Sequence, residues 1–354
     1  MRFLVTGGAG FIGSALVRKL LSYDDYEVIN IDALTYSGNL NSLTSELKNK
    51  RHYFEKCNIC DSEKLSNIFK KYQPNIVFNL AAESHVDRSI ENPEQFLQTN
   101  ILGTANVLNA SLNLWKENRN KSSASFRLIH ISTDEVYGDL GDSNSLFDEN
   151  FPYNPSSPYA ASKASSDHLV RAWGRTYDLP YVISNCSNNY GPYQFPEKFI
   201  PHIIINAIQG NNLPIYGNGL QIRDWLFVDD HVDALIKIAK LSDPMKSYNI
   251  GGHNEMKNFE VVQLICSYLD ELDLKKPIGL NSFKDLITYV SDRPGHDIRY
   301  AVDSSKIQSE LGWQPSGIFE DKLVNTIDWY LNNESWWQNI LNGEYKLNRL
   351  GKIE

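Results

Sequence analysis

Short apolar runs and amphipathic segments follow one another along the first half of the chain. Apolar runs bounded by turn residues predict buried strands, whereas apolar residues spaced three or four apart predict helices. Strands are predicted over residues 3–6, 27–31, 52–56, 75–80, 126–132 and 181–186, and helices over residues 14–21, 61–72, 93–117 and 159–177. Because strands alternate with helices, the sequence predicts an α/β fold with a parallel, doubly wound sheet.

This alternation stops after Cys186, where the chain becomes richer in loops. A strand over residues 221–230 is predicted to lead into a helix over residues 232–241, which would return to the first sheet. Residues 248–252 are predicted to begin the final crossing of the chain from the first sheet to the loop-rich part. The remaining predictions are a polar loop over residues 117–125, a helix over 259–269, a loop over 292–297, and a helix from about Phe319 in which Trp329, Trp336 and Trp337 pack.

The change in pattern predicts two domains. A Rossmann-type domain is expected to comprise residues 1–187 and 226–250. A second, smaller substrate-binding lobe is expected to comprise residues 188–225 and 251–354.

A glycine-rich turn, GGAGFIG at residues 7–13, lies between the first predicted strand and its helix. Gly7 and Gly10 would let backbone N–H groups approach a pyrophosphate at the helix N-terminus, and Gly13 would let the helix pack closely on the strand. The next strand ends at Asp32, whose carboxylate can accept hydrogen bonds from ribose hydroxyls and would repel a 2′-phosphate. Together these residues predict a dinucleotide site that favours NAD over NADP.

A hydroxyl and two carboxylates, Thr133, Asp134 and Glu135, follow the predicted strand over residues 126–132. Adjacent side chains of a regular strand point to opposite faces, so we expect an irregular strand end that lets both carboxylates reach one substrate. Two neighbouring carboxyl groups in a partly buried site can have well-separated pKa values. The strand end therefore predicts an acid and a base side by side.

Tyr159 and Lys163 lie four residues apart at the start of a predicted helix, after Ser157 and Pro158. A capping serine and a proline at the first helical position mark the helix start, so both side chains share one face. The lysine cation and the positive helix end would lower the pKa of the phenol, which predicts a base usable near neutral pH. A surface tyrosine beside a solvated lysine is the alternative, because this short motif is unspecific by itself.

Composition and charge narrow the function classes. The chain has 354 residues, a net charge of -9 and 42% hydrophobic residues, which is ordinary for a globular protein and argues against a nucleic-acid surface. It opens on a strand, without a signal segment or an apolar run long enough for a bilayer, so we expect a cytoplasmic protein that does not bind membranes.

Few residues suggest a metal or a disulfide. Four cysteines are too few for a disulfide framework, and the Cys57–Cys60 CxxC lacks the second pair that a zinc site needs, so we expect structural thiols. His85 has no partner histidine nearby and is expected to be structural. No metal site is predicted.

Longer motifs over nearly the whole chain resemble the extended short-chain dehydrogenase/reductases that act on nucleotide sugars. Among these they are most similar to the dTDP-glucose 4,6-dehydratase family. The motifs are AAESHVDRS at 81–89, STDEVYG at 132–138, SPYAASKASSDHLVRAW at 157–173, NCSNNYGPYQFPEK at 185–198, QIRDWLFVDDH at 221–231, YNIGGHNE at 248–255 and DRPGHD at 292–297.

The resemblance implies NAD as the cofactor, dTDP-glucose as the substrate, and a homodimer formed by the helices over residues 93–117 and 159–177. Asn58 stands where the family usually has an aspartate beside the adenine; its amide oxygen can still accept a hydrogen bond. The NAD site implied by the resemblance comprises Gly7, Gly10, Phe11, Ile12, Gly13, Asp32, Asn58, Ile59, Leu80, Ala81, Ala82, Thr99, Tyr159 and Lys163.

The same resemblance implies a substrate site. Ser84, Thr133 and Asn188 would hold the hexose, whereas Lys198, Arg223, Arg293 and His296 would hold the diphosphate and nucleoside, with Tyr216 near the base. Arginine forks match phosphate oxygens, although pairing of Arg223 and Arg293 with their neighbours Asp224 and Asp292 is the alternative.

The implied reaction is redox-neutral overall. Tyr159 would take the proton of the sugar 4-hydroxyl, with Lys163 beside it, while a hydride passes from C4 to NAD. Glu135 would then remove the C5 proton and Asp134 would protonate the departing 6-hydroxyl, before the hydride returns to C6. The product would be a 4-keto-6-deoxy sugar nucleotide.

Other functions stay open at this point. A 4-epimerase would use the same glycines, tyrosine and lysine but lacks the carboxyls beside the strand-end hydroxyl. GDP-mannose dehydratase and UDP-glucuronate decarboxylase resemble the chain but carry serine where Asp134 stands. A non-catalytic NAD-binding scaffold would tolerate loss of Tyr159, Lys163 or the carboxyls, all of which are present.

Overall fold

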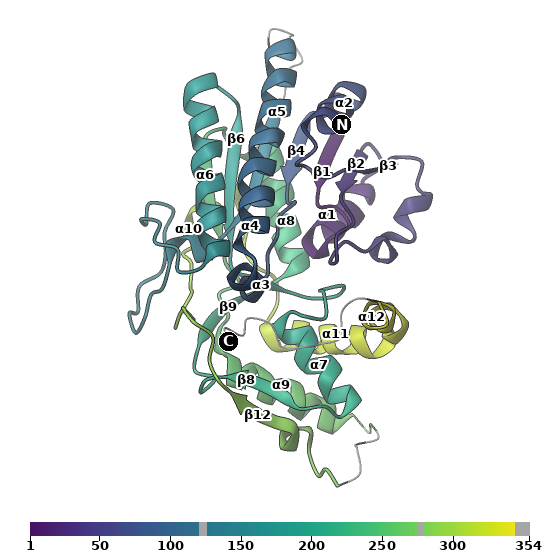
Figure 1. The fold of residues 1–354 in the computed structure, drawn as a ribbon, viewed down its shortest axis with the longest axis vertical. Coiled ribbons are helices and arrows are strands. Elements are labelled where there is room, and N and C mark those ends of the chain that lie inside the picture. Colours follow the sequence, from purple (N-terminus) through teal and green to yellow (C-terminus); the bar gives the residue numbers. More distant parts are fainter. Residues whose placement is uncertain (120–125, 273, 275, 277–278, 344–354) are drawn as a thin grey trace.

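The computed structural model describes residues 1–119, 126–272, 274, 276 and 279–343, and its main feature within them is a seven-stranded sheet (Figure 1). The order across this sheet is β3-β2-β1-β4-β5-β6-β10, and every neighbouring pair is parallel. The predicted doubly wound sheet is therefore confirmed. The strands are β1 (Arg2–Thr6), β2 (Glu27–Asp32), β3 (His52–Lys56), β4 (Ile76–Asn79), β5 (Arg127–Thr133), β6 (Tyr181–Cys186) and β10 (Lys246–Ile250).

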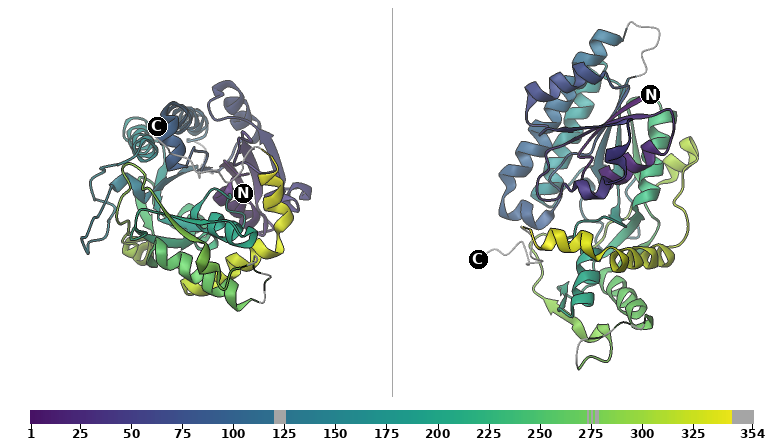
Figure 2. Two further views of the ribbon diagram at one scale, coloured as in Figure 1. Left: turned by 60° about the horizontal axis from the view of Figure 1, so that its bottom comes forward. Right: turned by 90° about the vertical axis from the view of Figure 1, so that its right-hand side faces the viewer.

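Helices cover both faces of this sheet (Figure 2). One face packs against α1 (Phe11–Leu21), α8 (Val228–Leu241) and α10 (Ser305–Leu311), and the other against α2 (Ser62–Tyr72), α5 (Thr104–Asn118) and α6 (Pro158–Tyr177). The strands are buried on both sides and consist of apolar runs, which is why their alternation with helices was visible in the sequence. The strand order reverses between β1 and β4, and ligands of such sheets bind beyond the carboxyl ends of the strands at this point.

The long helix predicted over residues 93–117 is interrupted. It consists of α4 (Pro93–Phe96), a π-helical segment (Leu97–Gly103) and α5, and the residues at both junctions have helical backbone angles. Such widened turns often occur at functional sites. A short helix before it, α3 (Val86–Glu91), was not predicted.

A smaller lobe occupies the lower part of Figure 1. It contains a sheet of β7 (Asn188–Tyr190), β9 (Ile222–Phe227) and β11 (Glu255–Lys257), and a pair formed by β8 (Leu213–Tyr216) and β12 (Ile287–Val290). Its core is also formed by α7 (Phe199–Gln209), α9 (Asn258–Glu271), α11 (Phe319–Asn332) and α12 (Glu334–Leu341).

Helix α7 was not predicted from the sequence. Its consecutive Ile203, Ile204 and Ile205 are all fully buried, so the helix has no polar face to reveal a helical period. Helix α10 packs on β10 and α8, with Ile307, Leu311 and Trp313 in the core of the large sheet. The segment around α10 thus lies with the large sheet, although residues 251–354 were expected in the smaller lobe.

Of the connector predicted over residues 117–125, residues 120–125 lie outside the described residues. None of the helices in the described part of the chain is both long and apolar enough to cross a membrane.

Candidate active site

A single continuous cleft runs along the carboxyl ends of the large sheet, where the strand order reverses. It begins at the glycine turn after β1 and ends at β7 and the segment before α7. All the residues predicted to bind NAD line it, namely Gly7, Gly10, Phe11, Ile12, Gly13, Asp32, Asn58, Ile59, Leu80, Ala81, Ala82, Thr99, Tyr159 and Lys163.

The glycine turn fits the pyrophosphate of the predicted cofactor. Helix α1 begins at Phe11, earlier than predicted, with Gly10 as its N-cap. No side chain caps this helix and no acidic residue lies in its first turn, so its N–H groups are available to an anion. A Cβ atom on Gly13 would lie 2.0 Å from the Gly7 carbonyl oxygen, so only glycine allows this close packing.

Asp32 lies at the carboxyl end of β2 and lines the cleft. Its Oδ2 accepts a hydrogen bond from the Ala9 N–H at 2.9 Å, which ties the strand end to the glycine turn. Burial raises the pKa of Asp32, and the backbone donors at Leu34 and Ala9 oppose this increase. Asn58, at the expected adenine position, uses its Oδ1 to accept from the Cys60 N–H at 2.9 Å.

The strand end that carries the predicted acid and base is irregular, as expected. Strand β5 ends at Thr133, and a 3₁₀ turn over Asp134–Tyr137 follows immediately. The Thr133 hydroxyl caps this turn and donates to Asp134 Oδ1 at 3.2 Å. Because the backbone bends there, Asp134 and Glu135 both line the cleft instead of pointing to opposite faces.

The two carboxyl groups differ in environment. Asp134 is 1% exposed, and its Oδ2 has no hydrogen-bond partner among the described residues. Burial, followed by the charge of Glu135, holds the pKa of Asp134 well above its usual range. Burial also raises the pKa of Glu135, but Arg293, Arg223 and Lys198 oppose that increase. Asp134 is therefore suited to the role of the acid, and Glu135, where cations oppose the rise in pKa, is suited to that of the base.

Tyr159 and Lys163 lie on the buried face of α6, so the surface alternative is wrong. The expected lowering of the Tyr159 pKa is not found. Burial, followed by the charge of Glu135, raises the pKa of Tyr159 well above its usual value, and the Lys163 ammonium donates to the Ile131 carbonyl at 2.7 Å. The prediction neglected the burial of the phenol, which opposes a negative charge more strongly than a helix end favours it.

Part of the predicted substrate site lies in the same cleft. Ser84, Thr133, Asn188 and Lys198 line it, and Asn188 Oδ1 is a buried carbonyl oxygen without a hydrogen-bond partner among the described residues. The Lys198 ammonium donates to the Ser84 carbonyl at 2.8 Å, which joins the two sides of the cleft. Unpaired buried acceptors such as Asn188 Oδ1 are suited to polar ligands such as sugar hydroxyls.

The other predicted substrate residues, Tyr216, Arg223, Arg293 and His296, do not line this cleft. Arg293 and Arg223 nevertheless act electrostatically on Glu135. The Arg223 side chain donates to the Asp297 and Ile298 carbonyls, not to Asp224.

Asp87 on α3 joins two of these residues and was missed in the sequence. It accepts from Arg293 Nη1 at 3.0 Å and from the Tyr216 hydroxyl at 3.1 Å. Arg293 is therefore not paired with Asp292 through its guanidinium. His296 Nδ1 lies 2.6 Å from Asp292 Oδ1, yet burial lowers the pKa of His296 to about 4. Asp87 is 206 residues from Arg293 in the chain, so no local sequence signal could reveal this contact.

A second set of cleft residues was also missed. The Tyr36 hydroxyl donates to Glu197 Oε1 at 2.8 Å, and Arg88 Nε lies 3.0 Å from Glu197 Oε2. The Arg88 guanidinium stacks over the Tyr36 ring at 3.9 Å. Tyr36 and Glu197 both line the cleft, so this cluster connects the cofactor side with the substrate side.

The remaining candidates have structural surroundings. All four cysteines are free thiols, and burial raises the pKa of Cys57 to about 11. Burial holds the pKa of His85 well below its usual value. Trp329 and Trp336 pack against Tyr193, as expected, although Trp336 also lines the cleft. Within the described residues, no cluster of His, Cys, Asp or Glu could hold a metal ion.

Comparisons with known proteins agree with this geometry. A family model described as GDP-mannose 4,6 dehydratase matches residues 4–326. The chain is 57% identical over 350 residues to dTDP-glucose 4,6-dehydratase of Neisseria meningitidis serogroup B, covering 99% of both chains.

Two solved structures that the chain resembles contain bound ligands. The dTDP-glucose 4,6-dehydratase of Bacillus anthracis in complex with NAD matches with a TM-score of 0.84 and 43% identity, covering 96% of this chain and 99% of that one. DesIV from Streptomyces venezuelae, a dTDP-glucose 4,6-dehydratase with NAD and TYD bound, matches with a TM-score of 0.86 and 40% identity, covering 96% of this chain and all (100%) of that one.

Proposed function

The chain belongs to the dTDP-glucose 4,6-dehydratase family, and we propose that its cleft converts dTDP-glucose to dTDP-4-keto-6-deoxyglucose with NAD as the internally recycled hydride carrier. It is an NAD-dependent hydro-lyase. The observation that carries the assignment is the buried Asp134–Glu135 pair at the bent end of β5, in the same cleft as Tyr159 and Lys163.

The chain's own residues perform the proton transfers. Tyr159 takes the proton of the sugar 4-hydroxyl, and the positive charge of Lys163, one helical turn along α6, is assigned to oppose the effect of burial on the phenol. The 4-ketone makes the C5 hydrogen acidic, and Glu135 removes it. Asp134, whose pKa burial raises well above its usual range, supplies the proton to the departing 6-hydroxyl.

NAD, when bound, supplies the hydride acceptor for C4 and the hydride donor for C6. The glycine turn and the uncapped start of α1 hold its pyrophosphate, and Asp32 accepts from a ribose hydroxyl. Leu80, Ala81 and Ala82 at the end of β4 leave room for a flat ring close to the backbone. The other cleft residues assigned to NAD are Ile59, Thr99 and Asn58.

The hexose is assigned to Ser84, Thr133 and Asn188 in the cleft. Lys198, Arg223 and Arg293 place positive charge near Glu135 and are assigned to the diphosphate and nucleoside together with His296, with Tyr216 near the base. Binding of a diphosphate would require Arg293 to exchange its contact with Asp87 for the ligand.

The proposed function also assigns a role to each of the two domains. Residues 1–187 and 226–250 form the NAD-binding domain, and residues 188–225 and 251–354 form the nucleotide-sugar-binding lobe, with α10 attached to the first of these. A homodimer formed through the long helices and a cytoplasmic location remain predictions.

The alternative enzymes differ from this assignment at the carboxyl pair after β5. An epimerase needs no acid for a leaving 6-hydroxyl, whereas Asp134 is buried and unpaired beside Glu135. GDP-mannose dehydratase and UDP-glucuronate decarboxylase carry serine there.

The experiment that tests the proposal is incubation of the purified protein with dTDP-glucose, UDP-glucose and GDP-mannose in separate reactions. A 4-keto-6-deoxy product from dTDP-glucose at the highest rate is expected. Preference for another nucleoside, or a product that has lost no water, would contradict it.

A further inference from the structure

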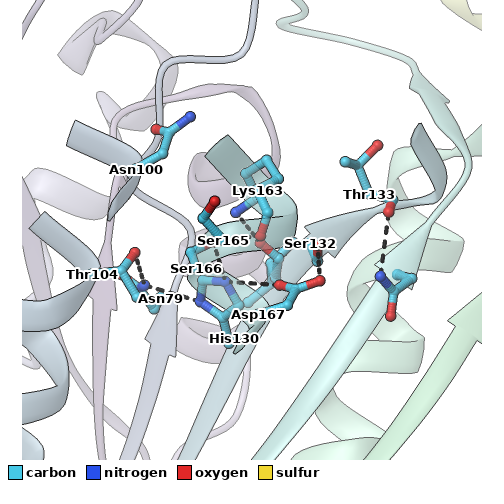
Figure 3. A network of polar contacts seen from close by, with 12 residues as sticks. Asn79, Asn100, Thr104, His130, Ser132, Thr133, Lys163, Ser165, Ser166 and Asp167 are labelled. Carbon is cyan, nitrogen blue, oxygen red and sulfur yellow. Dashed lines mark hydrogen bonds and ion pairs between the residues drawn. The ribbon is translucent and has the colours of Figure 1, made fainter. Parts of the chain in front are cut away.

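A buried polar network lies behind the catalytic residues, between β5 and α6 (Figure 3). Asp167, an acidic member of this network, lies one helical turn beyond Lys163, and its side chain is completely buried. It does not line the cleft, so it is not assigned to substrate or cofactor. An ionised carboxylate in such a place is costly unless charges and hydrogen bonds compensate it.

Several groups converge on the Asp167 carboxylate. Ser132 Oγ donates to Oδ2 at 2.7 Å, and the Tyr153 hydroxyl donates to the same atom at 2.9 Å. His130 Nε2 lies 3.3 Å from Oδ1. Burial by itself would raise the pKa of Asp167, but His130, Lys163 and Ser132 together lower it below its usual value. Asp167 is therefore a buried anion.

The His130 imidazole has one defined tautomer in this network. Asn79 Oδ1 accepts from Thr6 Oγ1 at 2.8 Å, so the Asn79 amide donates from Nδ2 to His130 Nδ1 at 3.1 Å. The proton of a neutral ring then lies on Nε2, which is 3.2 Å from Ser166 Oγ and 3.3 Å from Asp167 Oδ1. Burial lowers the pKa of His130, although its contact with Asp167 raises it. A second positive charge, besides His130, also lowers the pKa of Asp167.

Lys163 supplies that charge. Its ammonium donates to the Ile131 carbonyl, and the next residue, Ser132, donates to Asp167, so one strand segment holds both charged groups. Burial lowers the pKa of Lys163, and Asp167 is the largest influence that raises it. The other titratable groups that face the pair are Tyr137, Tyr153, Arg171 and Cys186.

We propose that Asp167 is a positioning residue for Lys163, whose buried carboxylate keeps the lysine ammonium charged and directed at the Ile131 carbonyl. The proposal rests on the function proposed above, in which Lys163 favours the Tyr159 phenolate. Cys186 does not replace Asp167 as the anion, because burial raises the pKa of its thiol to about 12. Without the Asp167 carboxylate, Lys163 would lose its proton at a lower pH.

The test is the pH profile of kcat for the wild type and for Asp167→Asn. Activity that requires a charged Lys163 falls on the alkaline side, and Asp167→Asn is expected to move that basic limb to lower pH by about one unit or more. KM for dTDP-glucose should change less than about threefold, because Asp167 does not touch the cleft. Asp167→Glu, which retains the charge, should keep the limb near its wild-type position.

Ser166→Ala is the matched control. Ser166 is a buried member of the same network, and its hydroxyl donates to the Lys163 carbonyl at 2.8 Å and lies 3.2 Å from His130 Nε2, but it carries no charge. Its removal therefore perturbs the network without removing the carboxylate. This variant should leave the basic limb in place. A limb that stays unmoved in Asp167→Asn, with activity reduced equally at every pH, would overturn the proposal.

A second measurement does not depend on turnover. Lys163 lines the NAD cleft, so the affinity for NAD should fall at a lower pH in Asp167→Asn than in the wild type, as measured by calorimetry. This separates failure of the proposal from failure of the assigned reaction. If Asp167→Asn does not fold, Asp167→Ser tests the same loss of charge with a smaller side chain, and an unshifted affinity profile would again overturn the proposal.

Discussion

At the residue scale, the chemistry depends on two adjacent carboxyl groups that differ in their surroundings. Asp134 is buried without a hydrogen-bond partner for Oδ2 among the described residues, whereas the charges of Arg293, Arg223 and Lys198 oppose the rise in the pKa of Glu135. The sequence predicted an acid beside a base. It did not reveal the cations that distinguish the two groups, because these come from distant parts of the chain.

Replacing each carboxyl group by its amide should separate the two proton transfers. Asp134→Asn should still form the 4-ketone but lose water slowly, because an amide cannot supply the proton. Glu135→Gln should instead block exchange of the C5 hydrogen with solvent. Each loss is expected to slow its step by about 10² to 10⁴-fold. Single-turnover reactions in deuterated water, quenched and read by mass spectrometry, measure both steps.

The two variants serve as controls for each other, since both keep the shape of the side chain. Rapid C5 exchange in Glu135→Gln would show that another group is the base. Undiminished loss of water in Asp134→Asn would remove the acid role from Asp134.

At the element scale, the large sheet was predictable and its functional irregularities were only partly so. Long apolar runs and the glycine turn predicted β1, α1 and β2 because local geometry dictates them. The bend after β5 was also expected. Helix α3, α7 and the π-helical segment were not, because they depend on packing against other parts of the chain.

Gly13 tests the packing of the glycine turn. In Gly13→Ala, the new Cβ would lie 2.0 Å from the Gly7 carbonyl oxygen, so the turn must open. We expect a loss of roughly 1–3 kcal/mol in the free energy of unfolding and weaker NAD binding. Urea unfolding and calorimetric titration with NAD provide the measurements.

Gly10→Ala is the matched substitution within the same turn. Its Cβ would lie 3.2 Å from the same carbonyl oxygen, and the φ of Gly10 is -77°, so a smaller loss is expected. Equal stability and equal NAD affinity of the Gly13→Ala and Gly10→Ala proteins would contradict the role assigned to Gly13.

At the scale of the whole molecule, the cleft is assembled from segments far apart in the chain. Arg293 contacts Asp87, and Glu197 contacts both Tyr36 and Arg88. The family motifs indicated that several of these segments belong to one site, but only the fold shows which side chains contact each other. This is why Asp87, Tyr36 and Glu197 were missed.

The predicted homodimer can be tested on the π-helical segment. Leu97 and Leu102 are 48% and 54% exposed, and they belong to the long helix expected at the interface. Replacing both by aspartate should convert a dimer to a monomer, because it would bury charge in an apolar contact. Sedimentation velocity measures the change.

Leu241→Asp is the control for surface charge. Leu241 is 61% exposed at the end of α8, which covers the other face of the sheet. It should leave the sedimentation coefficient unchanged. A dimer that survives the double substitution, or a wild type that is monomeric, would contradict the predicted interface.

Dehydration without net oxidation can be tested in one reaction. The wild-type protein is incubated with dTDP-glucose in deuterated water, and the product is analysed by mass spectrometry and NMR. We expect a 4-keto-6-deoxy sugar nucleotide that has lost one water, carries solvent deuterium at C5, and forms without accumulation of reduced cofactor. An epimerised sugar of unchanged mass, or accumulation of reduced cofactor in proportion to product, would contradict it.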